Sequence, residues 1–195
     1  KLMDMSFIDT IPNVFKCFSS CNKVITEFAM QDYEAIAELR QAALLPDSIR
    51  LSNFFTAEQY EAINSALLIN LGMGLEQLGR MKPAYLTEMF RNELLKKWLD
   101  YNDERSMETF FEAVAIQNNT PIYGLDNIKE TMYMIFDREP FHWQCEELYK
   151  IIEYPEKEVE LERTLKNMYS YGRLTDMAYA VKGPDNLSTL SYSDY

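Results

Sequence analysis

Apolar residues along most of the chain recur every three or four positions, which is the spacing of one face of an α-helix. The pattern is clearest between Thr56 and Gly72, where one face carries Tyr60, Ile63, Leu67 and Leu71. Gln59 stands three residues after Thr56, and this combination is typical of a capping box at a helix N-terminus. Gly72 and Gly74 end the pattern, so the sequence predicts a helix over 57–71.

The same periodicity predicts five further helices, over residues 11–21, 83–99, 106–117, 140–152 and 155–171. Three of them begin with a proline, at a position where the missing N–H costs no helical hydrogen bond. The helix over 106–117 has Ser106 as its expected N-cap and an acidic residue, Glu108, in its first turn. The helices within about 56–101 are expected to form a helical lobe.

Two short β-branched segments, 23–28 and 120–125, predict strands. Each follows an amphipathic helix, and this helix-then-strand order is typical of an α/β unit with parallel strands. We therefore expect an α/β fold that is predominantly helical, with a small and mainly parallel central sheet. Because two strands alone do not make a stable sheet, we expect partner strands outside these residues.

Two carboxylates close these predicted strands. Glu27 stands near the end of the first strand and Asp126 at the end of the second. Functional groups of an open α/β sheet gather beyond the carboxyl ends of its parallel strands, so both side chains are expected to face one cleft. The structural alternatives are that Asp126 caps the following helix and that Glu27 is buried against a helix N-terminus or an Arg such as Arg80.

Charge and composition exclude several classes of protein. Lys and Arg total 19 and Asp and Glu total 31, giving a net charge of −12, so binding of nucleic acid is not expected. Apolar residues make up 47% of the chain, enough for a packed core, and no run approaches the ~20 residues of a membrane span. The composition predicts a soluble, folded protein.

The remaining reactive residues do not form a recognisable catalytic set. His142 is the only histidine, and Cys145 three residues on lacks an orienting third group. The three cysteines do not have the spacing of a zinc site and are expected to be small buried core residues. The six glycines form no phosphate-binding loop.

Residues 106–126, SMETFFEAVAIQNNTPIYGLD, resemble the middle of the TraB/GumN family, which includes the Tiki metalloproteases. That family has an acidic residue, an apolar residue three positions on and an Ala four beyond it, here Glu108, Phe111 and Ala115. A turn and a strand ending in Gly-Leu-Glu follow, here Gly124-Leu125-Asp126 with Asp in place of Glu.

The resemblance extends over nearly the whole chain as spaced positions: Ile11 to Val14, Val24 to Glu27, Met81 to Ala84, Trp143-Gln144 with Leu148, and Tyr169 to Leu174. The chain is accordingly identified as a single TraB/GumN-like domain, residues 1–195, that is incomplete at both ends. The family's two Gly-x-x-His motifs have no counterpart here. Lys1 is not an initiator Met, and we expect a longer protein that carries these motifs.

The resemblance implies a metal-dependent hydrolase, with peptides among its expected substrates, in the bacterial periplasm or cell envelope. Manganese, cobalt or zinc would activate water at histidines outside this chain. Glu27 would be a metal ligand or the general base, and Asp126 would orient a ligand or the substrate. These 195 residues alone are expected to be inactive and to hold no metal tightly.

The alternative is a module that binds a peptide or protein without catalysis. In it, the helical lobe would grip a peptide or partner helix with methionine and phenylalanine side chains: Met73, Met81, Met89, Phe54, Phe55 and Phe90. Metal-dependent turnover by the full-length protein distinguishes the two functions.

Overall fold

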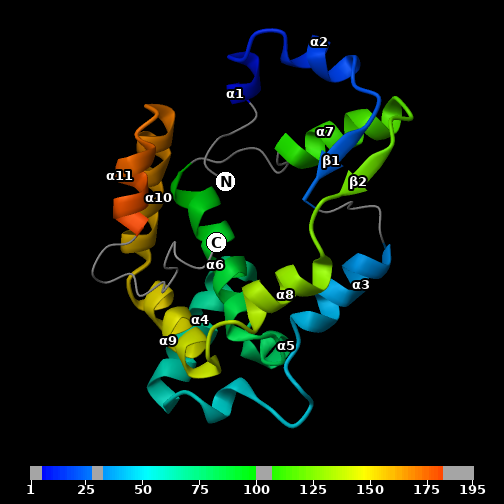
Figure 1. Ribbon diagram of the computed structural model, residues 1–195. Helices are drawn as coiled ribbons and strands as arrows, with labels where there is room; N and C mark the ends of the chain where they lie inside the picture. Colours follow the sequence, from blue (N-terminus) through cyan, green and yellow to red (C-terminus); the bar gives the residue numbers. More distant parts are fainter. Residues whose placement is uncertain (1–5, 28–32, 100–106, 182–195) are drawn as a thin grey trace.

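The computed structural model describes residues 6–27, 33–99 and 107–181, and most of them are helical (Figure 1). In chain order the elements are α1 (Ser6–Asp9), α2 (Val14–Ser19), β1 (Val24–Thr26), α3 (Tyr33–Ala42), η1 (Leu51–Asn53), α4 (Ala57–Leu71), α5 (Leu75–Leu78), α6 (Pro83–Trp98), α7 (Met107–Gln117), β2 (Ile122–Gly124), α8 (Ile128–Phe136), α9 (Phe141–Glu153), α10 (Pro155–Ser170) and α11 (Leu174–Val181). The predominantly helical α/β class is confirmed.

The two predicted strands form one parallel sheet, in which Val24 pairs with Ile122 and Thr26 with Gly124. Helix α7 packs against both strands and Val24 is buried. Ile25 and its partner Tyr123 are 57% and 56% exposed, because side chains of a strand alternate between faces. The sheet therefore has one covered face and one open face, and Figure 1 shows both strands running toward α3 and α8.

The main core lies among α4, α6, α9 and α10, where apolar side chains from each helix are fully covered. Leu67 of α4, Leu86 of α6 and Leu148 of α9 are each 0% exposed. A smaller cluster joins Met132 and Phe136 of α8 to Ala43, just after α3. The helices of the predicted lobe are thus held by helices far along the chain.

The ends of α4 have the geometry predicted from the sequence. The Thr56 hydroxyl accepts from the backbone N–H of Gln59 at 3.2 Å, and the Gln59 side chain accepts from the N–H of Thr56 at 3.0 Å. Gly72 ends the helix with φ of 70°, a left-handed conformation that glycine adopts without strain. The predicted capping box is confirmed.

The helix predicted over 11–21 is confirmed only over α2, at Val14–Ser19, because a non-helical segment separates α1 from α2. Asn13 has φ of 61°, and the helix restarts only at Val14. Pro12 disfavours helical conformation at the residue before it, and Asn tolerates the left-handed region better than most residues. The apolar spacing favours a helix from residue 11, but Pro12 and Asn13 favour a turn, and the turn delays the start of the helix to Val14.

The burial predicted for the cysteines holds only for Cys145. Cys17 and Cys21 are both exposed: Cys17 lies on α2, which has no buried residue, and Cys21 follows the end of that helix. Burial, with a smaller contribution from the charge of Glu146, raises the pKa of the Cys145 thiol to about 11. The packing of the segment that carries each cysteine, and not the general tendency of cysteine to be buried, determines its exposure here.

Gln144 is a buried polar link between three helices. Its Nε2 donates to the carbonyls of Phe136 and Glu139, both at 2.9 Å, and its Oε1 accepts from the N–H of Ala84 at 3.3 Å. Gln144→Leu keeps the volume but leaves these backbone groups without the side-chain partner, so the free energy of unfolding should fall by about 2–4 kcal/mol. Urea denaturation measures the change.

The matched control is Gln117→Leu at an exposed position of α7. Its free energy of unfolding should stay within about 0.5 kcal/mol of wild type. Equal losses in the two variants would show that the Gln144 hydrogen bonds contribute nothing specific.

Candidate functional site

Glu27 and Asp126 lie side by side at the carboxyl end of the sheet. Beyond the last paired residues, the N–H of Leu125 donates to the carbonyl of Thr26 at 2.8 Å, and that of Asp126 to the carbonyl of Glu27 at 3.0 Å. Both side chains are exposed. The parallel register thus brings the two predicted residues to one edge, as expected from the strand order.

A third carboxylate joins this edge from α7. The Oε1 atom of Glu108 accepts a hydrogen bond from the backbone N–H of Glu27 at 3.3 Å. We call Glu27, Glu108 and Asp126 the carboxylate edge. The sequence singles out Glu108 as a first-turn acidic residue and through the family resemblance, but no local pattern predicts its contact with a residue 81 positions away.

The structural roles left open for Glu27 and Asp126 do not apply. Asn127, not Asp126, is the N-cap of α8, with its Oδ1 accepting from the N–H of Lys129 at 2.9 Å. Arg80 forms its ion pair with Asp47. No ion pair joins any residue of the carboxylate edge to another described residue. Within the described residues, neither an ion pair nor a capping bond therefore gives the Glu27 or Asp126 carboxylate a purely structural role.

The described residues do not make a metal centre by themselves. Within 6–27, 33–99 and 107–181, no group of three or more His, Cys, Asp and Glu side chains is arranged to hold a metal ion. Glu112, one turn beyond Glu108, is buried with its Oε1 lacking a hydrogen-bond partner in this part of the structure. The only histidine, His142, is exposed on α9. Among the described residues, the carboxylate edge offers carboxylate oxygens as side-chain ligands.

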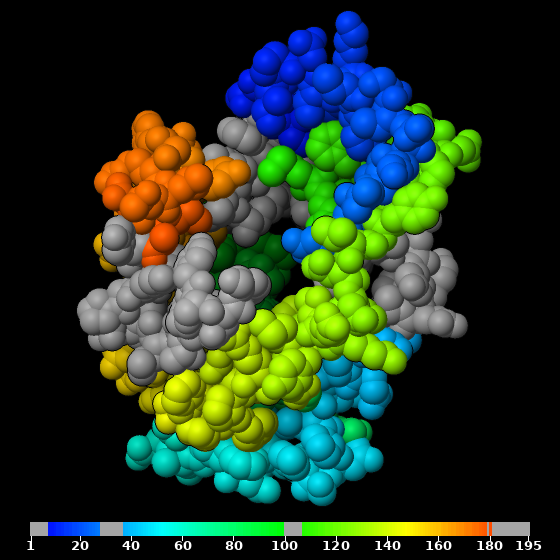
Figure 2. Space-filling model, viewed as in Figure 1, coloured from blue at the N-terminus to red at the C-terminus, as the bar shows by residue number. Residues whose placement is uncertain are grey.

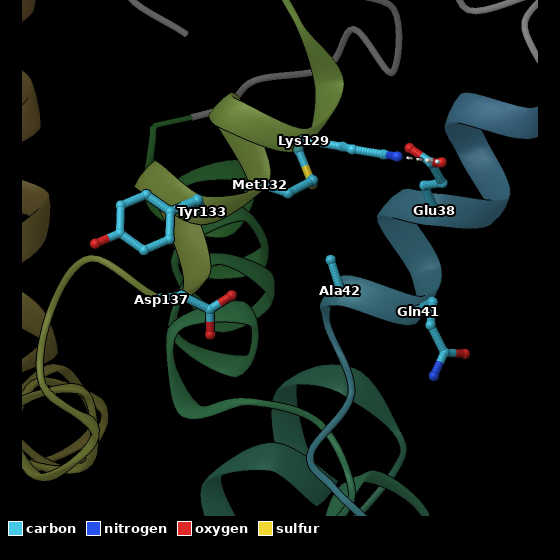
Figure 3. A pocket seen from close by; sticks show the side chains of 7 residues that line it. All are labelled: Glu38, Gln41, Ala42, Lys129, Met132, Tyr133 and Asp137. Carbon is cyan, nitrogen blue, oxygen red and sulfur yellow. Dashed lines mark ion pairs between the residues drawn. The ribbon is translucent and has the colours of Figure 1, made fainter.

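A cavity of about 370 Å³ lies between α3 and α8, the helices that follow the two strands (Figure 3). Glu38 and Lys129 reach across it from opposite helices, with Oε1 and Nζ 3.6 Å apart. Asp137, also on the cavity wall, is bound at 2.5 Å by the Nζ of Lys82. Because both helices begin beyond the strand ends, this cavity lies on the same side of the sheet as the carboxylate edge.

The six residues proposed to grip a partner do not form one surface. Phe90 is buried in the main core, and Phe55, Met81 and Met89 pack against it. Only Phe54 and Met73 are exposed, on different segments. Most of the set is core, as a sulfur and aromatic stripe at helical spacing usually is.

Comparison with known proteins identifies the family of the chain. In the described part, no helix has both the length and the apolar character to cross a membrane. No curated protein and no solved structure matches the chain. The sequence model of the TraB/PrgY/gumN family matches residues 2–193, which is nearly the whole length. The chain belongs to the TraB/PrgY/gumN family.

Proposed function

We propose that this chain is part of a hydrolase whose reactive site includes the carboxylate edge. The observation that carries the proposal is the parallel pairing of β1 with β2, which puts Glu27 and Asp126 at one strand end with their carboxylates exposed. Such strand ends are where α/β folds collect functional groups. The cavity between α3 and α8, the two helices that follow the strands, would give space for a substrate.

Glu27 is the group best held for chemistry. Its backbone N–H is bound by Glu108 and its carbonyl by the N–H of Asp126, so the main chain is fixed on both sides of the side chain. A carboxylate held in this way can accept a proton from an attacking water molecule. Asp126, next to it, would orient the substrate, and Glu108 is a positioning residue.

The family resemblance adds a divalent metal to this proposal, with manganese, cobalt and zinc all suited to oxygen and nitrogen ligands. Glu27 would be an oxygen ligand of that metal if it is not the general base. Nitrogen ligands would come from histidines outside this chain, because His142 lies on α9, away from the strand ends. The proposed substrate is a peptide or protein.

Removal of metal tests the hydrolase assignment. The full-length protein, dialysed against a chelator, should lose nearly all hydrolysis of a mixed fluorogenic peptide library and regain it when manganese, cobalt or zinc is added back. Circular dichroism before and after dialysis controls for unfolding. Activity that survives complete metal removal would contradict metal dependence, and absence of turnover with every metal would leave a binding module as the function.

That second function has one observation in its favour, the open face of the sheet. Ile25 and Tyr123 are more than half exposed on it, and Leu125 follows them at 75% exposure. An exposed apolar strand face is typical of a surface that another segment covers. Tight peptide binding without turnover is the outcome that identifies this function.

A further inference from the structure

A groove separate from the carboxylate edge runs along α9. Its cavity of about 500 Å³ lies between α9 and the segment 54–59, which precedes and begins α4. Figure 2 shows yellow α9 against the cyan part of the chain at the bottom of the view. We call this cavity the α9 groove. It contains no residue of the carboxylate edge.

Aromatic rings make up much of its wall. Phe54, Phe55, Tyr149 and Tyr154 line the groove. Phe54 is 48% exposed and is held edge-on against Phe141, with ring centroids 4.6 Å apart. A rigid ring that keeps half its surface in water offers a ready stacking face for a ligand.

The charge of the groove is negative. Glu146 and Glu153 line it, and the one cationic lining residue, Lys150, is bound at 2.9 Å by Glu147 outside the groove. The charge of Glu153 raises the pKa of the neighbouring Tyr154 hydroxyl. The Tyr154 ring also accepts a cation, since the Nζ of Lys157 stands 4.4 Å from its centroid. Aromatic faces beside carboxylates favour a cationic ligand, and among side chains arginine most.

The distance between the two groove carboxylates sets the spacing of the basic residues in a matching peptide. Glu146 and Glu153 are seven residues apart on one helix, which is about 10.5 Å along the axis. A peptide in the polyproline II conformation rises about 3.1 Å per residue and completes a turn in about three residues, so its side chains three positions apart lie on one side and about 9 Å apart. Two arginines separated by two other residues therefore match the two carboxylates.

We propose that the α9 groove binds a basic peptide segment in the polyproline II conformation, with two arginines three positions apart contacting Glu146 and Glu153 and stacking on the rings of Phe54 and Tyr149. The acidic net charge of −12 favours approach of such a partner. This site is independent of the proposed hydrolytic function and holds whether or not the protein turns over a substrate.

Calorimetric titration at low salt with two synthetic hexapeptides tests the proposal. One peptide has two arginines separated by two alanines, and the other has the same composition with the arginines adjacent. The spaced peptide should bind the protein about three- to fivefold more tightly, because only it reaches both carboxylates at once. Glu146→Gln and Glu153→Gln should each weaken its binding by a similar factor and remove the preference for spacing.

Glu160→Gln is the matched control, because it also removes one exposed negative charge, but on α10. Its affinity for the spaced peptide should stay within about twofold of wild type. Phe54→Leu keeps an apolar side chain and should still weaken binding, because stacking is lost. Equal affinity for both peptides, or equal effects of the three Glu variants, would mean general attraction to an acidic protein and would overturn the proposal. No binding heat with either peptide would also overturn it.

Discussion

Glu27→Gln should lower metal-dependent peptide hydrolysis by the full-length protein at least about 100-fold, while the melting temperature stays nearly unchanged. The amide keeps the size of the side chain and loses the charge that would accept a proton or bind a metal. Stability should not change, because the structure holds Glu27 through its backbone, with Glu108 and Asp126 as partners. Turnover and thermal melting of the same preparation measure both effects.

Glu130→Gln is the matched control for this variant. Glu130 is exposed in the first turn of α8, close to the strand end but not on the carboxylate edge. Turnover by the Glu130→Gln variant should remain within about twofold of wild type, since a single exposed charge changes rates little. If Glu27→Gln retains full turnover, Glu27 has no part in the reaction.

Leu67→Ala should lower the free energy of unfolding by about 2.5–4 kcal/mol. Leu67 is 0% exposed in the core between α4, α6 and α9, so the substitution removes buried carbons and leaves a cavity. Urea denaturation followed by circular dichroism gives the difference.

The next residue provides the control. Leu68 lies on the same helix and is 47% exposed, and its replacement by Ala removes the same atoms as Leu67→Ala. Leu68→Ala should cost less than about 1 kcal/mol, because the side chain is already half in water. Similar losses at both positions would contradict the core that the structure places around α4.

The long helices could be predicted to within a residue or two at their ends. The helix predicted over 83–99 is α6, at Pro83–Trp98, and that over 155–171 is α10, at Pro155–Ser170. In both, apolar periodicity and an initial proline are local signals that agree with the final packing. The turn at Pro12-Asn13 is not predicted, because the apolar spacing there favours a helix while these two residues favour a turn.

Only part of the candidate site was predictable. Glu27 and Asp126 each follow a strand, so their common edge follows from parallel pairing. The contact of Glu108 with the Glu27 N–H depends on how α7 packs under the sheet, which no spacing in the sequence encodes. The same holds for the N-cap of α8, where Asn127 and Asp126 are both good capping residues and backbone geometry decides between them.

The most direct test of the central claim is a double-mutant cycle on turnover of the full-length protein, with Glu27→Gln, Asp126→Asn and both together. If the two carboxylates belong to one site, the double variant should be scarcely slower than the slower single variant, because groups that act together give non-additive losses. Losses that multiply fully in the double variant, or an Asp126→Asn variant as fast as wild type, would show that the carboxylate edge is not one functional site.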